Sequence, residues 1–169
     1  SREDVDAYHY WVVGGYAGVS CAGPGTLGSD GFDTCASADE TAAFAAVVQW
    51  LAGDESVKAY TDKTSGIEVK ADWSNGNVAM TGQSYAGSTA FAVASTGVEG
   101  LKTIVPRAGI ASWYDYYRSQ GTAAGGLYYP GDDCNILADY CMSRQLDTGD
   151  YAAIQGDYEA YQAQMIQDQ

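Results

Sequence analysis

The sequence predicts an α/β fold, in which short parallel strands alternate with helices. Two apolar segments, 77–82 and 101–109, have the length and composition of buried strands. The segment between them, 84–96, is rich in small residues that suit a helix packed closely on a sheet. A further helical pattern at 37–53 precedes the first of these strands, and this order is typical of a parallel sheet covered by helices.

Composition limits the function classes. The 169 residues are 46% apolar, which is enough to bury the core of one globular unit. Eight basic against twenty-two acidic residues give a net charge of -14, which argues against nucleic acid or an anionic membrane as partner. No segment is long and apolar enough to span a membrane, and the first residues do not resemble a signal peptide. A cytoplasmic location is expected, with secretion as the alternative.

The four cysteines are interpreted as reduced thiols, because they lack the close paired spacing of a zinc site. A pairing of Cys134 with Cys141, seven residues apart, is the alternative. Neither a metal nor a cofactor is expected.

The amino-terminal third is predicted to contain a helix end, a strand and a second helix. Residues 5–14 have an amphipathic pattern closed by Gly14 and Gly15, and the apolar run 16–21 is predicted to be a buried strand. A loop rich in Gly, Pro, Asp and Ser follows. Ser37 with Glu40 three residues later forms the pattern of a capping box, so a helix should begin there and end at Gly53.

The middle of the chain carries the predicted sheet. Residues 54–76 are polar, so we expect them on the surface, with a turn leading into the strand 77–82. The strand at 101–109 should stop at Pro106. From residue 111 the chain becomes aromatic and loop-like, and two helices are expected in 134–169. These changes predict two parts, 1–110 and 111–169.

The turn between the strand 77–82 and the following helix has the pattern of a nucleophile elbow. In hydrolases of the α/β type, the nucleophilic serine lies on such a turn, with small residues two positions to either side. Gly82 and Ala86 flank Ser84 in this way, and the second glycine of G-x-S-x-G is displaced to Gly87. The backbone N–H of Tyr85 would then face a developing oxyanion. In the alternative interpretation, Ser84 is simply a helix N-cap.

With these residues in view, the chain resembles the X-prolyl dipeptidyl aminopeptidases, which are serine peptidases of α/β-hydrolase fold. Residues 68–118 look like the centre of that family's catalytic domain, and G-Q-S-Y-A-G at 82–87 matches the family's own form of the elbow. The stretches 15–31 and 47–53 are also similar. The resemblance implies a central fragment: a partial α/β-hydrolase fold in 1–110, followed by the beginning of a helical cap or inserted domain in 111–169.

The resemblance also implies roles for five residues. Ser84 would be the acylating nucleophile, and the N–H of Tyr85 would be one oxyanion donor. Trp113 and Tyr116 would be aromatic walls of the pocket for the penultimate proline; alternatively, they pack a helical turn onto the sheet. Asp132, in the sequence P-G-D-D, stands where the family has a glutamate that pairs with the substrate's ammonium group. The alternative there is a turn followed by a helix N-cap.

A serine needs a general base, and the expected order along the chain in this fold is Ser, then Asp or Glu, then His. His9, the sole histidine, precedes Ser84, so the triad acid and base are expected beyond residue 169. The function predicted for the intact enzyme is release of X-Pro dipeptides from peptides with a penultimate proline, by an enzyme that is dimeric if it follows the resemblance. The fragment alone should be inactive. The alternatives are a related acyl esterase or acylase, and a non-catalytic module that binds proline-containing peptides.

Overall fold

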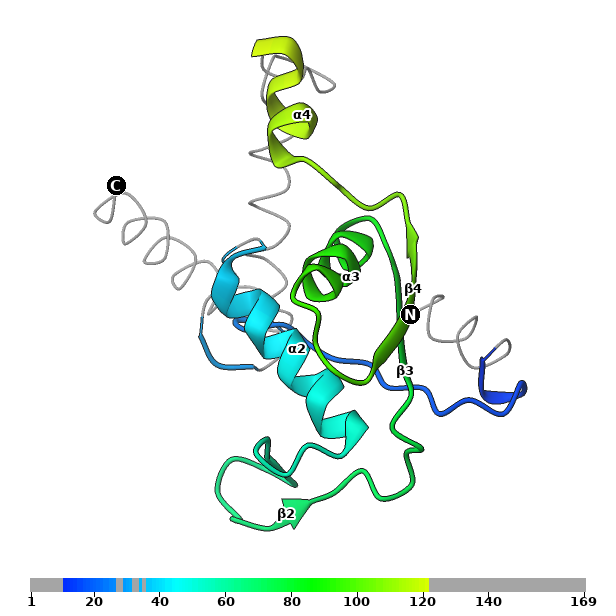
Figure 1. The fold of residues 1–169 in the computed structure, drawn as a ribbon. Coiled ribbons are helices and arrows are strands. Elements are labelled where there is room, and N and C mark those ends of the chain that lie inside the picture. The colour runs from blue at the N-terminus through cyan, green and yellow to red at the C-terminus, as the bar shows by residue number, and fades with distance from the viewer. Residues whose placement is uncertain (1–10, 27–28, 32–33, 35, 122–169) are drawn as a thin grey trace.

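A computed structural model describes residues 11–26, 29–31, 34 and 36–121. Within this part, the predicted order of helix, strand, helix and strand over 37–109 is present, with a further pair of short strands after the first helix, and two of the strands form a parallel pair (Figure 1). The elements in chain order are α2 (Ala38–Ala52), β1 (Ala59–Tyr60), β2 (Glu68–Val69), β3 (Val78–Gln83), α3 (Tyr85–Ser95), β4 (Leu101–Arg107), α4 (Trp113–Arg118) and the 3-10 helix η2 (Ser119–Gly121). No helix among these residues is long and apolar enough to cross a membrane.

The parallel pair β3–β4 and the helices α2 and α3 enclose the described core. β3 and β4 run in register from Ala79 opposite Thr103 to Gln83 opposite Arg107. α3 packs on both strands, and α2 runs beside α3 and contacts β3 (Figure 1). Apolar side chains from all four elements and from the loop before β4 fill the space between them: Phe44, Ala45, Val48, Leu51, Val78, Met80, Val93, Val98 and Leu101. This core holds α3 against the sheet.

The helix predicted from Ser37 to Gly53 is confirmed. The Ser37 hydroxyl accepts a hydrogen bond from the N–H of Glu40 at 3.2 Å, as an N-cap should. Gly53 ends the helix in the left-handed region, with a φ of 87°. The second half of the capping box differs, because the Glu40 carboxylate accepts a hydrogen bond from Ala36 N–H instead of Ser37 N–H.

The buried strand predicted at 16–21 is wrong. These residues have no regular structure and are exposed, although the chain just before them does end a helical turn, with Gly15 at a φ of 88°. A strand needs a neighbour to bond its main chain, and no other strand of the described part pairs with this segment.

Two predictions around β4 are also wrong. The strand does not stop at Pro106 but continues to Arg107. The Arg107 carbonyl accepts a hydrogen bond from Ser84 N–H, so the main chain of Arg107 faces β3. The main chain of Pro106, one residue earlier, therefore faces the other edge of β4. Proline is tolerated there because no strand of the described part requires an N–H donor at that edge. The segment after residue 111 is not a loop, since Trp113–Arg118 form the helix α4, which projects away from the sheet (Figure 1).

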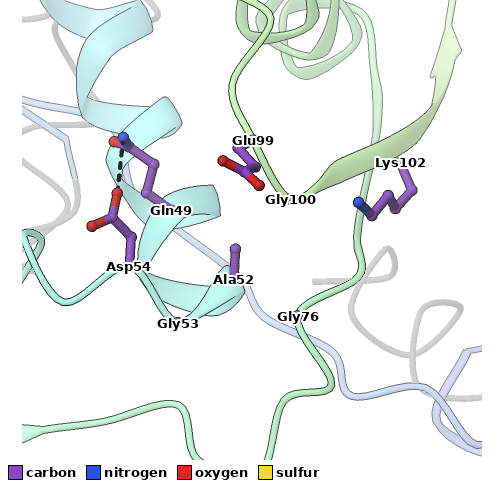
Figure 2. A pocket seen from close by; sticks show the side chains of 8 residues that line it. All are labelled: Gln49, Ala52, Gly53, Asp54, Gly76, Glu99, Gly100 and Lys102. Carbon is purple, nitrogen blue, oxygen red and sulfur yellow. Dashed lines mark hydrogen bonds between the residues drawn. The ribbon is translucent and has the colours of Figure 1, made fainter.

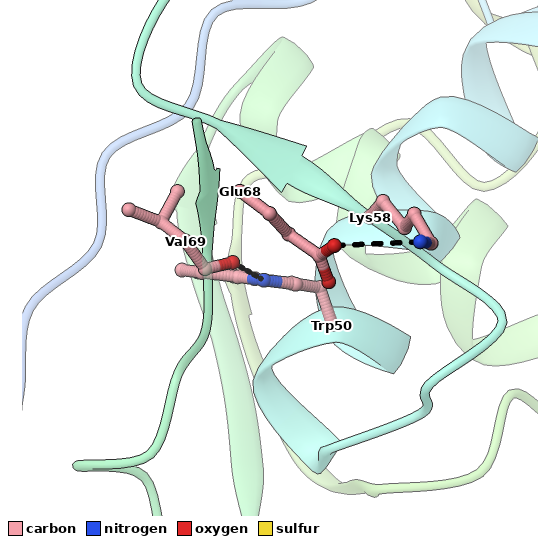
Figure 3. Close-up of polar contacts among 4 residues, drawn as sticks. All are labelled: Trp50, Lys58, Glu68 and Val69. Carbon is pink, nitrogen blue, oxygen red and sulfur yellow. Dashed lines mark hydrogen bonds and ion pairs between the residues drawn. The ribbon is translucent and has the colours of Figure 1, made fainter. Parts of the chain in front are cut away.

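The polar segment 54–76 is exposed over most of its length, as predicted, but it contains a small antiparallel pair that the sequence analysis missed. In Figure 3, the indole N–H of Trp50 on α2 donates to the Val69 carbonyl at 3.1 Å, and Lys58 pairs with Glu68 at 3.3 Å. The ion pair is exposed, so it contributes little to stability. The Trp50 hydrogen bond connects β2 to α2.

The amino end of α3 approaches the end of β4 more closely than a side chain would permit. A Cβ on Gly87 would lie 2.9 Å from the Arg107 carbonyl oxygen and 3.2 Å from Gly109 Cα. A Cβ on Gly109 would lie 2.8 Å from the Gly87 carbonyl carbon. Because these contacts are mostly with main chain, no side-chain movement can relieve them. The two glycines therefore set how closely the helix packs on the sheet.

We predict that Gly87→Ala lowers the free energy of unfolding by about 2 kcal/mol, because overpacking against main chain exceeds the roughly 1 kcal/mol that alanine gains in a helix. Urea unfolding of the intact protein measures the change. Gly18→Ala is the matched control, since a Cβ there meets its nearest neighbour, Val12, at 3.7 Å. Equal effects of the two substitutions would contradict the prediction.

Candidate active site

Ser84 lies on a sharp turn between β3 and α3. β3 ends at Gln83 and α3 begins at Tyr85, so a single residue reverses the direction of the chain. Its φ of 59° and ψ of -123° belong to a region that non-glycine residues rarely occupy, at a cost of about 1–3 kcal/mol. The turn is held by a hydrogen bond from Ser84 N–H to the Arg107 carbonyl at 2.9 Å. The described geometry is that of a nucleophile elbow.

The Ser84 side chain does not act as a helix cap. It makes no capping hydrogen bond, and the residue is exposed at the carboxyl end of β3. Ser37 on α2, in contrast, makes the ordinary N-cap bond. Ser84 thus occupies the N-cap position of α3, but its hydroxyl does not make the capping hydrogen bond that the alternative interpretation would need.

The spacing of small residues around Ser84 has a physical explanation. A Cβ on Gly82 would lie 2.6 Å from the Cβ of Ala86 and 2.7 Å from its carbonyl carbon and oxygen, so position 82 admits no side chain, whereas position 86 holds a methyl group. The displaced glycine, Gly87, is the residue that touches β4. In this turn, glycine is needed at position 87, where the helix meets β4, and position 86 can be alanine.

The amino end of α3 has two features that matter for the site: a positive electrostatic potential, and hydrogen bonds that hold the turn at Ser84 in place. Tyr85 is the first residue of the helix, and N–H groups of a first turn point toward the helix's amino end, where the helix dipole is positive. No acidic residue in that turn offsets it. The buried Ser88 hydroxyl accepts from Ile110 N–H at 2.8 Å and donates to the Ser84 carbonyl at 3.3 Å, which ties the elbow to the chain after β4.

An aromatic cluster lies beside the elbow. The ring of Tyr85 is 6.1 Å from that of Trp113, centroid to centroid. Trp113 in turn stacks on Tyr117 at 5.8 Å and meets Tyr116 edge-on at 6.3 Å. No residue of α4 is buried, so this helix is not packed onto the sheet as the alternative interpretation supposed. The structure thus brings the predicted residue Trp113 to the neighbour of Ser84, and Tyr116 to Trp113.

The remaining predictions for the site fall outside the described residues. Asp132 and His9 lie there, as do three of the four cysteines; Cys21 is a free, exposed thiol. Within the described part, no three His, Cys, Asp or Glu side chains gather as a metal site would require. The sequence analysis missed the partners of the Tyr85 hydroxyl, which are Glu40 and Ala36. In the sequence, Glu40 stands out only as part of the capping-box pattern with Ser37, which suggested a role at the start of its own helix.

A hollow of about 420 Å³ lies at the opposite, amino ends of β3 and β4 (Figure 2). It is lined by Gln49, Ala52, Gly53, Asp54, Gly76, Glu99, Gly100 and Lys102. The hydroxyl of Ser56 donates to Asp54 and lowers the pKa of that carboxyl, which accounts for Asp54 as part of a turn. Ligands of open α/β sheets bind at the carboxyl ends of strands, so Ser84, not this hollow, marks the candidate active site.

Comparison with known proteins agrees with this geometry. The sequence matches the family X-Pro dipeptidyl-peptidase (S15 family) over residues 1–169. The chain belongs to this family. The resemblance to X-prolyl dipeptidyl aminopeptidases, based on residues 68–118 and the elbow, is therefore confirmed.

Several curated relatives carry the name Xaa-Pro dipeptidyl-peptidase. The one from Lacticaseibacillus rhamnosus is 48% identical over 160 residues, which cover 95% of this chain and 20% of the relative. The one from Pediococcus pentosaceus is 44% identical over 161 residues, with the same coverage. The one from Lactobacillus helveticus is 44% identical over 156 residues, covering 92% of this chain and 19% of the relative. The chain thus spans about a fifth of the length of these S15 relatives.

The strained turn predicts an unusual order of stability in the full-length S15 protein. Ser84→Gly should raise the free energy of unfolding by about 1 kcal/mol, because glycine adopts this conformation without strain. Ser84→Ala should be nearly neutral, since no capping bond is lost. Ser37→Ala, the matched control at a true cap, should cost about 1 kcal/mol. Thermal unfolding measures all three, and a stabilising effect of the native serine over glycine would contradict the strain.

Proposed function

We propose that the full-length protein is a serine peptidase that releases X-Pro dipeptides from the amino termini of peptides, with Ser84 as its nucleophile. The observation that carries the proposal is the exposed, strained serine at the carboxyl end of β3, immediately before a helix with an uncompensated positive end. Membership of the S15 family supports it, and relatives that carry the name Xaa-Pro dipeptidyl-peptidase support the substrate class.

In the proposed mechanism, the Ser84 hydroxyl attacks the carbonyl carbon of the proline residue while a general base takes its proton. The negative charge that develops on the carbonyl oxygen is stabilised by the N–H of Tyr85 and the α3 dipole. Collapse of the tetrahedral intermediate breaks the C–N bond, and the base returns the proton to the leaving amine. Water then hydrolyses the acyl-enzyme. The base and its orienting acid are proposed to be a His and an Asp beyond residue 169.

The substrate's proline is proposed to pack against Trp113 and Tyr116. A proline ring is flat, apolar and lacks an N–H, so flat aromatic faces can select it by contact area. The contact of Trp113 with Tyr85 supports this, because it places the aromatic cluster next to the residue that follows the nucleophile. Asp132 is proposed to pair with the substrate's free ammonium group.

The architecture proposed for the full-length protein is an α/β-hydrolase domain that includes 1–110, followed from residue 111 by a helical cap or insert. Two observations support this architecture. The chain leaves the sheet after β4, and α4 projects away from it (Figure 1). Ala79, Thr81 and Gln83 are exposed, and parallel sheets are usually covered on both faces, so further elements should cover this side of β3.

Ser84→Ala in the full-length protein should abolish hydrolysis of a glycyl-prolyl anilide, with a loss of about 10³-fold or more. It should equally abolish covalent labelling by a fluorophosphonate probe. Ser95→Ala, an exposed serine at the other end of α3, is the control and should leave both unchanged. Persistent labelling of the Ser84→Ala protein would remove the assignment, and turnover of a simple aryl ester without the anilide would favour an acyl esterase.

Trp113→Ala should raise the KM for the prolyl anilide and lower kcat/KM by about 10-fold to 100-fold, because an aromatic wall contributes a few kcal/mol of apolar contact. Hydrolysis of p-nitrophenyl acetate, which has no proline, should change by less than about twofold. Trp73→Ala is the matched control: Trp73 is an exposed tryptophan that packs edge-on against Trp50 in the last turn of α2. Equal losses on both substrates would exclude a proline-binding role for Trp113.

A further inference from the structure

The side chain of Tyr85 is held by a buried carboxylate on a different helix. Its hydroxyl donates a hydrogen bond to Oε2 of Glu40, near the start of α2, and accepts one from Ala36 N–H at 2.7 Å. Ala36 N–H also lies 2.5 Å from Glu40 Oε2, so the three groups form a closed triangle. The residue that follows the nucleophile is thus connected to a point 45 positions earlier in the chain.

This triangle is costly to build. Only 4% of Glu40 is exposed, and a buried carboxylate is expensive unless it is well hydrogen-bonded. Ala36 has a φ of 63°, in the left-handed region that disfavours a side chain. The helix itself does not need Glu40's carboxylate as a cap, since Ser37 already supplies one and Asp39 supplies a charge in the first turn. Such costs are concentrated at functional sites.

The other face of Tyr85 meets the proposed substrate pocket. Its ring contacts Trp113 at 6.1 Å with an interplanar angle of 50°. Because α4 has no buried residue, the core does not fix Trp113 in place. The ring of Tyr85 on α3 is instead a contact that connects Trp113 to the packed part of the structure. A fixed Tyr85 therefore restricts where Trp113 can lie relative to Ser84.

We propose that Glu40 is a positioning residue that sets selectivity for proline: it holds the Tyr85 hydroxyl, and the Tyr85 ring in turn supports Trp113. This inference rests on the proposed function, because it needs Ser84 as nucleophile and Trp113 as a pocket wall. It adds a residue of α2 that touches neither the substrate nor the reacting atoms. Its effect should appear in the choice of substrate more than in the chemistry at Ser84.

The test compares Tyr85→Phe, Glu40→Gln and Glu40→Ala in the full-length protein, on glycyl-prolyl and glycyl-alanyl anilides. Tyr85→Phe keeps the ring and the backbone N–H but loses the hydroxyl, and should lower the proline-to-alanine ratio of kcat/KM by about tenfold. Glu40→Ala should match it. Glu40→Gln, which keeps an oxygen acceptor, should lose only about threefold. Tyr114→Phe, on an exposed tyrosine of α4, is the control and should change nothing.

Two further measurements separate this role from a merely structural one. Because Glu40 acts through Tyr85, the double variant Glu40→Ala/Tyr85→Phe should lose no more selectivity than either single variant. In Glu40→Ala, fluorophosphonate labelling of Ser84 and hydrolysis of p-nitrophenyl acetate should stay within about twofold, because Glu40 touches neither the substrate nor the reacting atoms. If Glu40→Ala does not fold, Glu40→Gln and Tyr85→Phe decide the question alone.

An unchanged proline-to-alanine ratio in Tyr85→Phe, with or without a lower melting temperature, would overturn the inference and leave the nucleophile assignment intact. Additive losses in the double variant would also overturn it, since Glu40 would then act by another route. Failure of the proposed function has a different signature: the wild-type protein would be labelled at a site other than Ser84.

Discussion

Close contact between the start of α3 and the ends of β3 and β4 is the constraint on which the described structure depends. Gly82, Gly87 and Gly109 allow main chain to meet main chain where any Cβ would collide. This approach leaves Ser84 with a positive φ, since one residue must turn the chain from strand to helix. The strain is balanced by core packing on α3 and by the hydrogen bond from Ser84 N–H to the Arg107 carbonyl.

The same geometry explains why one end of the sheet suits acyl chemistry. The exposed hydroxyl, the first-turn N–H groups and the positive end of the α3 dipole all meet at the carboxyl end of β3. The side chain of Tyr85 extends this arrangement in two directions, to Glu40 on α2 and to Trp113 on α4. Three helices that are separate in sequence are thus connected through Tyr85, the residue beside Ser84.

Local signals predicted the elements well wherever short-range chemistry decides them. Ser37 and Gly53 set the ends of α2, and the run of small residues after Ser84 correctly indicated a helix packed on a sheet. Errors arose where a distant partner decides. The run 16–21 has strand-like residues but no bonded neighbour in the described part, and Pro106 stays in β4 because its side of the strand carries no ladder bond there. Aromatic residues after 111 formed the helix α4, which composition alone did not indicate.

The sequence by itself determined the family, the alternation of strand and helix, and the position of the strained serine, because motif spacing and capping residues are local properties of the chain. Only the tertiary structure decided which groups meet that serine's neighbourhood. It replaced a reciprocal capping box at Glu40 with a bond to Tyr85, and it brought Trp113 against the same ring. Hydrogen bonds and ring contacts between residues 28 and 45 positions apart depend on how α2, α3 and α4 pack, and no local pattern encodes that packing.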